Sequence, residues 1–239
     1  RAAVLTTELQ RSFGWTGAEA FVQQDAQECW AVIFEHLSAA CAGTALGRHL
    51  ETAHRGELED RLTCRACGGA RGRKEPFRDL ALAVRGARTL ARAFALYGAE
   101  ETLEGVECER CAARTPHAKA LVLRALPELL ALQLRRFDFD WATMTRVKVN
   151  DHLAFPRVLD ARGLVKARAR DGAAAERDEA AERDEYELLA ALMRTGSAHA
   201  GHYFAYIRDV AAGGGGDAAA GGGDDDAAAG GARWLKFND

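Results

Sequence analysis

The residues best suited to chemistry lie in the last sixth of the chain. His202 follows a glycine and opens the run GHYFAYIR, whose period-two alternation predicts a strand. The chain closes with RWLKFND, a second short run that ends in Asn238 and Asp239. If the two runs form an antiparallel hairpin, the amide or the carboxylate returns to the imidazole and can orient it while the ring transfers a proton. A lone histidine at a loop end is more often structural, so this hypothesis depends on the closing residues.

Four of the six cysteines form two C-x-x-C pairs, Cys64 with Cys67 and Cys108 with Cys111. Each such turn places two thiolates on one side of a tight loop, and two turns together supply the four sulfur ligands of a structural zinc site. The pairs are roughly 40 residues apart, so we expect them at the tips of two long hairpins. The alternatives are an unmetallated relic of such a site or adventitious disulfides.

The other two cysteines are not expected to be nucleophiles. Asp25 stands at the position of a helix cap, and Cys29, Ile33 and Leu37 follow at helical spacing. We therefore expect a helix that carries Cys29 on its apolar side. Burial raises the pKa of a thiol, which disfavours the thiolate that a nucleophile needs. Cys41 lies in or after the same helix.

Five ordered blocks resemble the ubiquitin-specific proteases, papain-like cysteine proteases that remove ubiquitin. The blocks are QQDAQE (23–28), LPELLALQLRRF (126–137), KVNDHLAFP (148–156), GHYFAYIR (201–208) and WLKFND (234–239). The resemblance implies an α+β fold of the papain-like type, with a palm β-sheet, zinc-knuckle fingers and a thumb that is only partly present. It implies a single catalytic domain over residues 1–239, with thumb helices in 1–45, fingers in 46–125 and palm in 126–239.

The resemblance also assigns catalytic roles. His202 would take the proton of a cysteine, and the thiolate would attack the carbonyl of the last glycine of ubiquitin. Asn238 would hold the imidazole tautomer, a task that Asp239 could share. His199 is the rival base, but in the family the catalytic histidine is the one that precedes the tyrosine.

Further residues are candidates for binding ubiquitin. Gly201 and Tyr203 would line the narrow channel for its glycine-glycine tail. Gln24 and Asp25 would face the basic part of the same tail, although Asp25 could equally serve only as a helix cap. The four paired cysteines would hold the structural zinc at the far end of the fingers.

The nucleophile itself is not matched. In the family it lies in a block that ends in Asn-Thr-Cys, upstream of the block at 23–28, and nothing before residue 21 resembles it. One interpretation is a segment of an active deubiquitinase whose cysteine block precedes Arg1; the alternative is an inactive, ubiquitin-binding pseudo-protease. The retained His202, Asn238 and Asp239 and the lack of an initiating methionine favour the first. A zinc-knuckle adaptor for other proteins is a third, weaker alternative.

Composition limits the partners and the compartment. The 239 residues are 48% hydrophobic, enough to bury a substantial core. A formal net charge of −3 gives no basic field for nucleic acid or for an anionic membrane. We see no membrane span and no signal peptide, and the cysteine usage suits a reducing compartment. We therefore expect a cytoplasmic or nuclear protein, without choosing between the two.

Several segments carry weaker expectations. Residues 46–97 contain strand-like runs, and Leu130, Leu132 and Leu134 alternate as a buried strand. Residues 161–185 repeat AERDE and are expected to be an insertion. Residues 211–232 contain only Ala, Gly and Asp and are expected to form a flexible loop between the two catalytic strands. The run YELLAALMR favours a helix by propensity, but the resemblance implies a strand.

Overall fold

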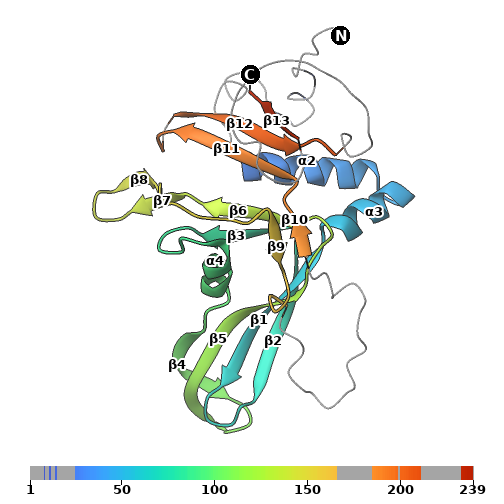
Figure 1. Cartoon of the computed structure of the whole chain (residues 1–239). Coiled ribbons are helices and arrows are strands. Elements are labelled where there is room, and N and C mark those ends of the chain that lie inside the picture. Colours follow the sequence, from blue (N-terminus) through green and yellow to red (C-terminus); the bar gives the residue numbers. More distant parts are fainter. Residues whose placement is uncertain are drawn as a thin grey trace.

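The computed structural model describes residues 25–165, 185–198, 200–210 and 233–238, together with residues 8, 11 and 14. The insertions expected at 161–185 and 211–232 lie largely or wholly outside these residues. The described helices are α2 (Ala26–Ala40), α3 (Ala45–His54) and α4 (Leu90–Tyr97). The strands are β1 (Gly56–Cys64), β2 (Ala70–Phe77), β3 (Asp79–Ala83), β4 (Glu101–Cys108), β5 (Ala113–Ala125), β6 (Ala131–Arg135), β7 (Phe137–Asp140), β8 (Thr145–Lys148), β9 (Val158–Asp160), β10 (Glu185–Glu187), β11 (Ala190–Gly196), β12 (Gly201–Arg208) and β13 (Trp234–Phe237). Figure 1 shows them in space.

A long four-stranded antiparallel sheet forms one end of the molecule. Its strand order is β2-β1-β5-β4, and it extends away from the other sheets (Figure 1). We call this sheet, with its turns, the fingers. Its strands are joined by an ion pair between Arg124 of β5 and Glu59 of β1, both largely buried. The turns from β1 to β2 and from β4 to β5 contain the two cysteine pairs, so the expected placement at two hairpin tips is confirmed.

The hydrophobic core lies where β3, β6 and α4 meet. Strand β3 alternates, so Leu80 and Leu82 point into the core and are buried, and β3 pairs in parallel with β6. Helix α4 buries Leu90, Ala93 and Phe94, which have the i, i+3, i+4 spacing of one helix face. The predicted strand at 130–134 is confirmed as β6, whose leucines pack on this core.

A separate three-stranded antiparallel sheet holds the end of the chain, in the order β11-β12-β13. We call it the palm sheet. Arg208 pairs with Trp234 and Ala205 with Phe237, so the predicted hairpin between the two aromatic runs is confirmed. The run YELLAALMR forms β10 and most of β11, as the resemblance implied and against its helix propensity.

The strand-like runs expected within residues 46–97 are confirmed as β1, β2 and β3, and the two ends of that range form α3 and α4. Each helix is started by a threonine that precedes it. The Thr44 hydroxyl accepts a hydrogen bond from the Gly47 amide at 3.1 Å, and the Thr89 hydroxyl accepts one from the Arg92 amide at 3.2 Å. These N-caps satisfy amides that the first helical turn leaves unpaired, and they outweigh the local strand pattern.

Candidate active site and metal centre

His202 and Asn238 lie side by side in the palm sheet. The Nε2 atom of His202 is 2.8 Å from the amide oxygen Oδ1 of Asn238. Because an amide oxygen can only accept, Nε2 is the donor in this contact. Both side chains are exposed. The contact therefore fixes the orientation of the imidazole ring at the exposed end of the palm sheet.

The strand register explains this proximity. Phe237 pairs with Ala205, so Asn238 continues β13 beside Phe204. Successive side chains on a strand alternate between faces, so His202 and Phe204 share one face of β12. Asn238 is thus a diagonal neighbour of His202 on that face, which is within reach of an imidazole ring. Asp239 and His199, the other two candidates for this chemistry, lie outside the described residues.

A tight turn precedes His202. Gly196 has a φ of +92°, and the amide of Ser197 donates to the carbonyl of Ala200 at 2.8 Å. A side chain on Gly201 would begin 2.2 Å from the carbonyl oxygen of Thr195, so glycine is required there. Tyr203 points to the face of β12 opposite His202. Gly201 and Tyr203 are thus next to the base, and their role toward substrate stays a prediction.

Asp25 caps α2 as predicted. Its Oδ1 accepts hydrogen bonds from the amides of Gln27 at 2.8 Å and Glu28 at 3.4 Å. This bond pattern accounts for the helix start, and it leaves the second carboxylate oxygen available for other contacts. Gln24 lies outside the described residues.

Cys29 and Cys41 lie within and at the end of α2, in settings that do not favour a thiolate. Burial raises the pKa of the Cys29 thiol, as expected from its place within α2. The amide of Cys41 donates to the carbonyl of Leu37 at 2.9 Å and closes the last turn of that helix. One detail of the predicted apolar face is wrong, because Leu37 is 46% exposed. The buried face runs instead through Phe34, which is 2% exposed.

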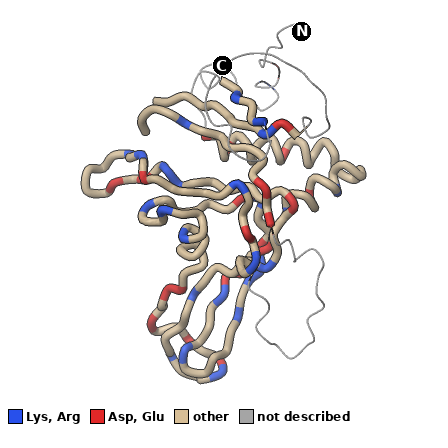
Figure 2. Tube along the Cα trace, in the orientation of Figure 1, with Lys and Arg blue, Asp and Glu red and all other residues tan. Residues whose placement is uncertain are grey.

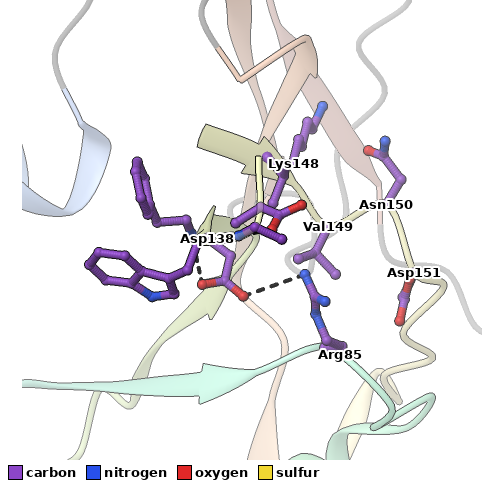
Figure 3. Close-up of a pocket in the computed structure, with 11 residues that line it drawn as sticks. Arg85, Asp138, Lys148, Val149, Asn150 and Asp151 are labelled. Atoms are coloured by element: carbon purple, nitrogen blue, oxygen red, sulfur yellow. Dashed lines mark hydrogen bonds and ion pairs between the residues drawn. The ribbon is translucent and has the colours of Figure 1, made fainter. Parts of the chain in front are cut away.

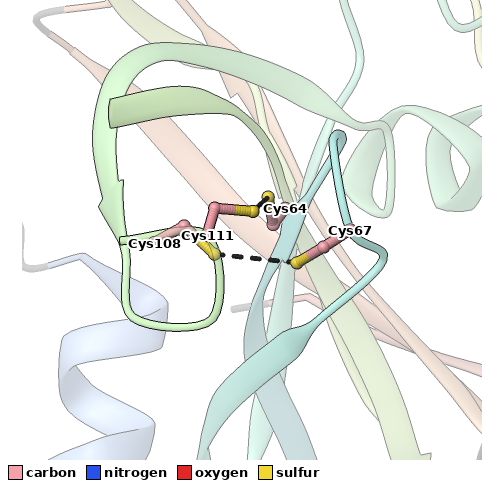
Figure 4. Close-up of side chains that lie close together, drawn as sticks. All are labelled: Cys64, Cys67, Cys108 and Cys111. Carbon is pink, nitrogen blue, oxygen red and sulfur yellow. Dashed lines mark hydrogen bonds between the residues drawn. The ribbon is translucent and has the colours of Figure 1, made fainter. Parts of the chain in front are cut away.

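The four paired cysteines converge at the fingers' tip (Figure 4). Their sulfur atoms all lie within 4.8 Å of one another, with 3.9 Å between Cys64 and Cys111 and 3.7 Å between Cys67 and Cys108. All four are free thiols, so no disulfide joins them. A regular tetrahedron with metal–sulfur bonds of about 2.3 Å has edges of about 3.8 Å. The set therefore has the size and the donor chemistry to hold one metal ion.

The two C-x-x-C turns share a left-handed backbone conformation. The residue after the second cysteine of each pair has a left-handed conformation, with φ of +69° at Gly68 and +46° at Ala112. The hydroxyl of Thr115, 3.2 Å from the sulfur of Cys64, lowers the pKa of that thiol to about 5. The adjacent sulfurs, Cys67 first, raise the pKa of Cys111 to about 12. Four thiolates this close repel one another, and a bound cation would remove that repulsion.

A cavity of about 650 Å³ lies beside the β7–β8 hairpin (Figure 3). Its wall includes Arg85 and Asp138, whose charged groups are 3.4 Å apart. It also includes Lys148, whose ammonium group donates to the carbonyl oxygens of Gly196 at 2.9 Å and Arg194 at 3.2 Å. These contacts connect the hairpin to the turn before His202. Sequence reasoning missed them, because no local pattern links residues so far apart.

Charges of both signs are interleaved along the fingers (Figure 2). Arg65 pairs with Glu100 at 3.3 Å, and Lys74 pairs with Glu57 at 2.6 Å. This surface differs from the single-sign field typical of nucleic-acid binding. In the part of the chain that the structure describes, no helix combines the length and the apolar character needed to cross a membrane.

Comparison with solved structures identifies the fold. The chain superposes on the structure of the SAGA Ubp8/Sgf11/Sus1/Sgf73 DUB module bound to ubiquitin aldehyde with a TM-score of 0.70 and 24% identity. The match covers 92% of this chain and 45% of that one. The same module bound to monoubiquitin gives a TM-score of 0.71 at 22% identity. The α+β fold with a palm sheet and fingers, expected from the sequence, is confirmed.

Sequence relatives identify the family. The model of the family described as ubiquitin carboxyl-terminal hydrolase matches residues 1–239. Ubiquitin carboxyl-terminal hydrolase 47 of Xenopus tropicalis is 30% identical over 89% of this chain, and that of Homo sapiens is 35% identical over 67%. The chain spans about a fifth or less of the length of these relatives, 20% and 12% respectively. The chain belongs to the ubiquitin carboxyl-terminal hydrolase family, as a catalytic domain of the ubiquitin-specific protease type.

Proposed function

We propose that this protein is a cysteine-type deubiquitinase that hydrolyses the bond after the C-terminal glycine of ubiquitin. The observation that carries the proposal is the 2.8 Å contact between His202 Nε2 and Asn238 Oδ1. The contact engages Nε2 and orients the ring, and we assign to Nδ1 the role of proton acceptor that a base for a thiol requires. Family membership supports the same activity, and the relatives are named for hydrolysis at the ubiquitin carboxyl terminus.

The mechanism follows from this geometry. Nδ1 of His202 takes the thiol proton, and the thiolate attacks the carbonyl carbon of the last ubiquitin glycine. The imidazolium that forms then gives its proton to the departing amine. Water, activated by the same nitrogen, releases ubiquitin from the acyl-enzyme. Asn238 holds the ring throughout, and as a neutral amide it orients the imidazolium without adding charge.

The thiol comes, we propose, from a segment outside these 239 residues. Cys64, Cys67, Cys108 and Cys111 form the cysteine cluster, at the end of the fingers remote from the palm sheet (Figure 1). Cys29 has a raised pKa within α2, and Cys41 closes that helix. None of these settings activates a thiolate beside His202.

An inactive ubiquitin-binding protein is the alternative function, because a base without a thiol cannot perform acyl transfer. The orientation of His202 favours the active form. An exposed histidine with no proton to transfer gains little from a second side chain that fixes its tautomer.

We propose zinc as the ion in the cysteine cluster. Sulfur-to-sulfur distances of 3.7 and 3.9 Å fit tetrahedral zinc-thiolate geometry. The ion would join the two hairpin tips and stabilise the fingers, with no part in the reaction. Free thiols in every described cysteine suit a reducing compartment, so we place the protein in the cytoplasm, the nucleus or both.

Ubiquitin is the proposed partner. Relatives in the solved structures are bound to ubiquitin aldehyde and to monoubiquitin. Asp25 and Gln24 at the start of α2 would contact the basic tail of ubiquitin, and Gly201 and Tyr203 would line the path of its last two glycines. Asp239 is a second candidate to support the imidazole.

Hydrolysis of ubiquitin that carries a fluorogenic C-terminal amide tests the function. A form of the protein that includes the thiol segment should release the fluorophore, whereas the 239-residue chain should bind ubiquitin without cleaving it. Binding by both forms with cleavage by neither would establish the inactive alternative. Cleavage by the 239-residue chain alone would show that the nucleophile is one of its six cysteines.

A further inference from the structure

The position of His202 depends on the turn that precedes it. Gly196, the last residue of β11, pairs with Gly201, the first residue of β12, and His202 follows directly. Inside the turn, the amide of Ala200 donates to the hydroxyl of Ser197 at 3.2 Å, in addition to the backbone bond between the same two residues. Ser197 and Ala200 are therefore joined by two hydrogen bonds. Its placement relative to the rest of the palm depends on contacts from outside the sheet.

Lys148 supplies such contacts from β8. Its ammonium group donates to the carbonyl oxygens of Gly196 at 2.9 Å and Arg194 at 3.2 Å, so one side chain holds two successive points of the strand that enters the turn. In Figure 3 the ammonium group points away from the Arg85–Asp138 pair. Among the described residues no carboxylate lies within ion-pair distance of it, although Asp138 and Asp151 line the same cavity.

Arg194 makes a second connection between the same two regions. Its guanidinium lies 4.5 Å from the ring centre of Phe137, the first residue of β7, and 5.6 Å from that of Tyr203. The same guanidinium donates to the carbonyl of Ser197 at 2.9 Å. The β7–β8 hairpin and the turn are thus held together by two cations, one from each side.

We propose that Lys148 is a positioning residue for catalysis, which holds the 196–201 turn so that His202 keeps its ring against Asn238. The expected effect on kcat rests on the proposed deubiquitinase function. The expected effect on the position of the turn and of the His202 ring does not. A side chain with one cationic group and two main-chain acceptors fixes both distance and direction. Its loss leaves the Gly196 carbonyl without that donor and lets the turn move as a unit. A shift of about 1 Å at a catalytic base lowers the rate by about 100-fold.

The first experiment needs no nucleophile. Nitrogen chemical shifts of the His202 ring, measured by NMR in the 239-residue chain, report which ring nitrogen is protonated. The unaltered chain should show one tautomer, with the proton on Nε2. Lys148→Met, which keeps the aliphatic stem, should give averaged shifts for the two nitrogens and broadened amide signals at residues 197–201. Lys148→Arg restores two donors and should restore the single tautomer.

The second experiment measures ubiquitin hydrolysis by the form that contains the thiol. Lys148→Met should lower kcat by about 10- to 100-fold with KM nearly constant, and Lys148→Arg should recover most of it. Lys236→Met is the matched control, since it removes the same charge from β13 of the palm sheet, where the ammonium lies over the Phe204 ring at 4.8 Å. That control should change neither the ring tautomer nor kcat appreciably.

The outcomes separate the two proposals. Unchanged ring shifts and unchanged kcat in a folded Lys148→Met protein would overturn the positioning role. If the unaltered protein does not hydrolyse ubiquitin but Lys148→Met still changes the His202 tautomer, the positioning role stands and the deubiquitinase proposal fails. Should Lys148→Met not fold, the Lys148→Arg protein decides: a single tautomer supports the role, and averaged shifts contradict it.

Discussion

The cysteine cluster of the fingers and the His202–Asn238 pair of the palm sheet differ in how completely this chain builds them. The cluster draws all four ligands from two hairpin turns, and Cys64 and Cys108 are buried. The palm pair is exposed and joins the proposed base to the amide proposed to orient it, and its nucleophile is proposed to come from outside these residues. A structural metal site has to be closed, whereas a catalytic site has to remain open to reactants.

This difference separates stability from activity. The cluster should organise the fingers without help from outside the chain, because its ligands and their supporting turns are all present. The palm pair, by our proposal, takes its proton from a thiol outside these 239 residues. Disturbing either region should therefore leave the other intact, and the following changes test that independence.

Metal removal should have the largest effect. Apparent binding free energies of structural zinc-thiolate sites are about 10–16 kcal/mol, so chelation should unfold the tip of the fingers. Metal analysis of freshly purified protein should give one zinc per chain, and Cys108→Ser should abolish it, while Cys41→Ser serves as the control with full zinc. The His202 signals should not change. Much less than one equivalent of metal, or fingers that keep their amide signals after chelation, would contradict a structural site.

Loss of the base should come next. In the form that contains the thiol, His202→Ala should lower kcat for ubiquitin hydrolysis by about 1,000-fold or more, because proton transfer by a positioned base contributes up to about 10,000-fold. Zinc content and thermal stability should stay constant. His49→Gln, an exposed histidine on α3, is the control. Activity within tenfold of the unaltered protein would identify another base, with His199 the first to test.

Removal of the orienting amide should have a smaller effect on the same step. Asn238→Ala should lower kcat by about 10- to 100-fold, because a hydrogen bond to a charged group contributes about 1.5–3 kcal/mol. Asn238→Asp should keep more activity, since a carboxylate also accepts from Nε2 and stabilises the imidazolium. The comparison of kcat for these two variants is the measurement. An equal loss in both would show that the amide does not act through the ring.

The smallest effect is expected in the backbone of the second knuckle. Ala112 has a φ of +46°, where glycine is less strained, so Ala112→Gly should raise the free energy of unfolding of the metal-bound fingers by about 0.5–1 kcal/mol. Gly68→Ala makes the opposite change at the equivalent position, φ +69°, and should lower it by a similar amount. Chemical denaturation of the zinc-loaded protein measures both. If both substitutions change the free energy of unfolding in the same direction, backbone strain is not the cause.

Both regions could be predicted from the sequence because their signals are short and local. Two C-x-x-C pairs predict a set of four sulfur ligands from their spacing alone. The alternation in GHYFAYIR and the penultimate residue Asn238 place the proposed base and its partner once a hairpin is assumed. The sequence could not show where strand pairing overrides the local helix propensity. YELLAALMR forms strands because it pairs with β12 and β9, not because of its composition.

Long-range contacts were beyond prediction for a physical reason. Lys148 reaches carbonyl oxygens 46 and 48 residues away, and no periodicity couples such positions. The exposure of Leu37 was also unpredictable, because helical spacing defines a face but not what covers it. Asp239, Gln24 and His199 lie outside the described residues, so their assignments stay predictions from the family resemblance.

The central claim is that this chain provides the base and its support but not the nucleophile, and ubiquitin with a C-terminal propargylamide tests it most directly. The 239-residue chain should form no covalent adduct with this probe. A longer form should form one, on a cysteine outside these residues, and should lose it in the His202→Ala variant. An adduct mapped by mass spectrometry to any of the six cysteines, Cys29 above all, would contradict the account.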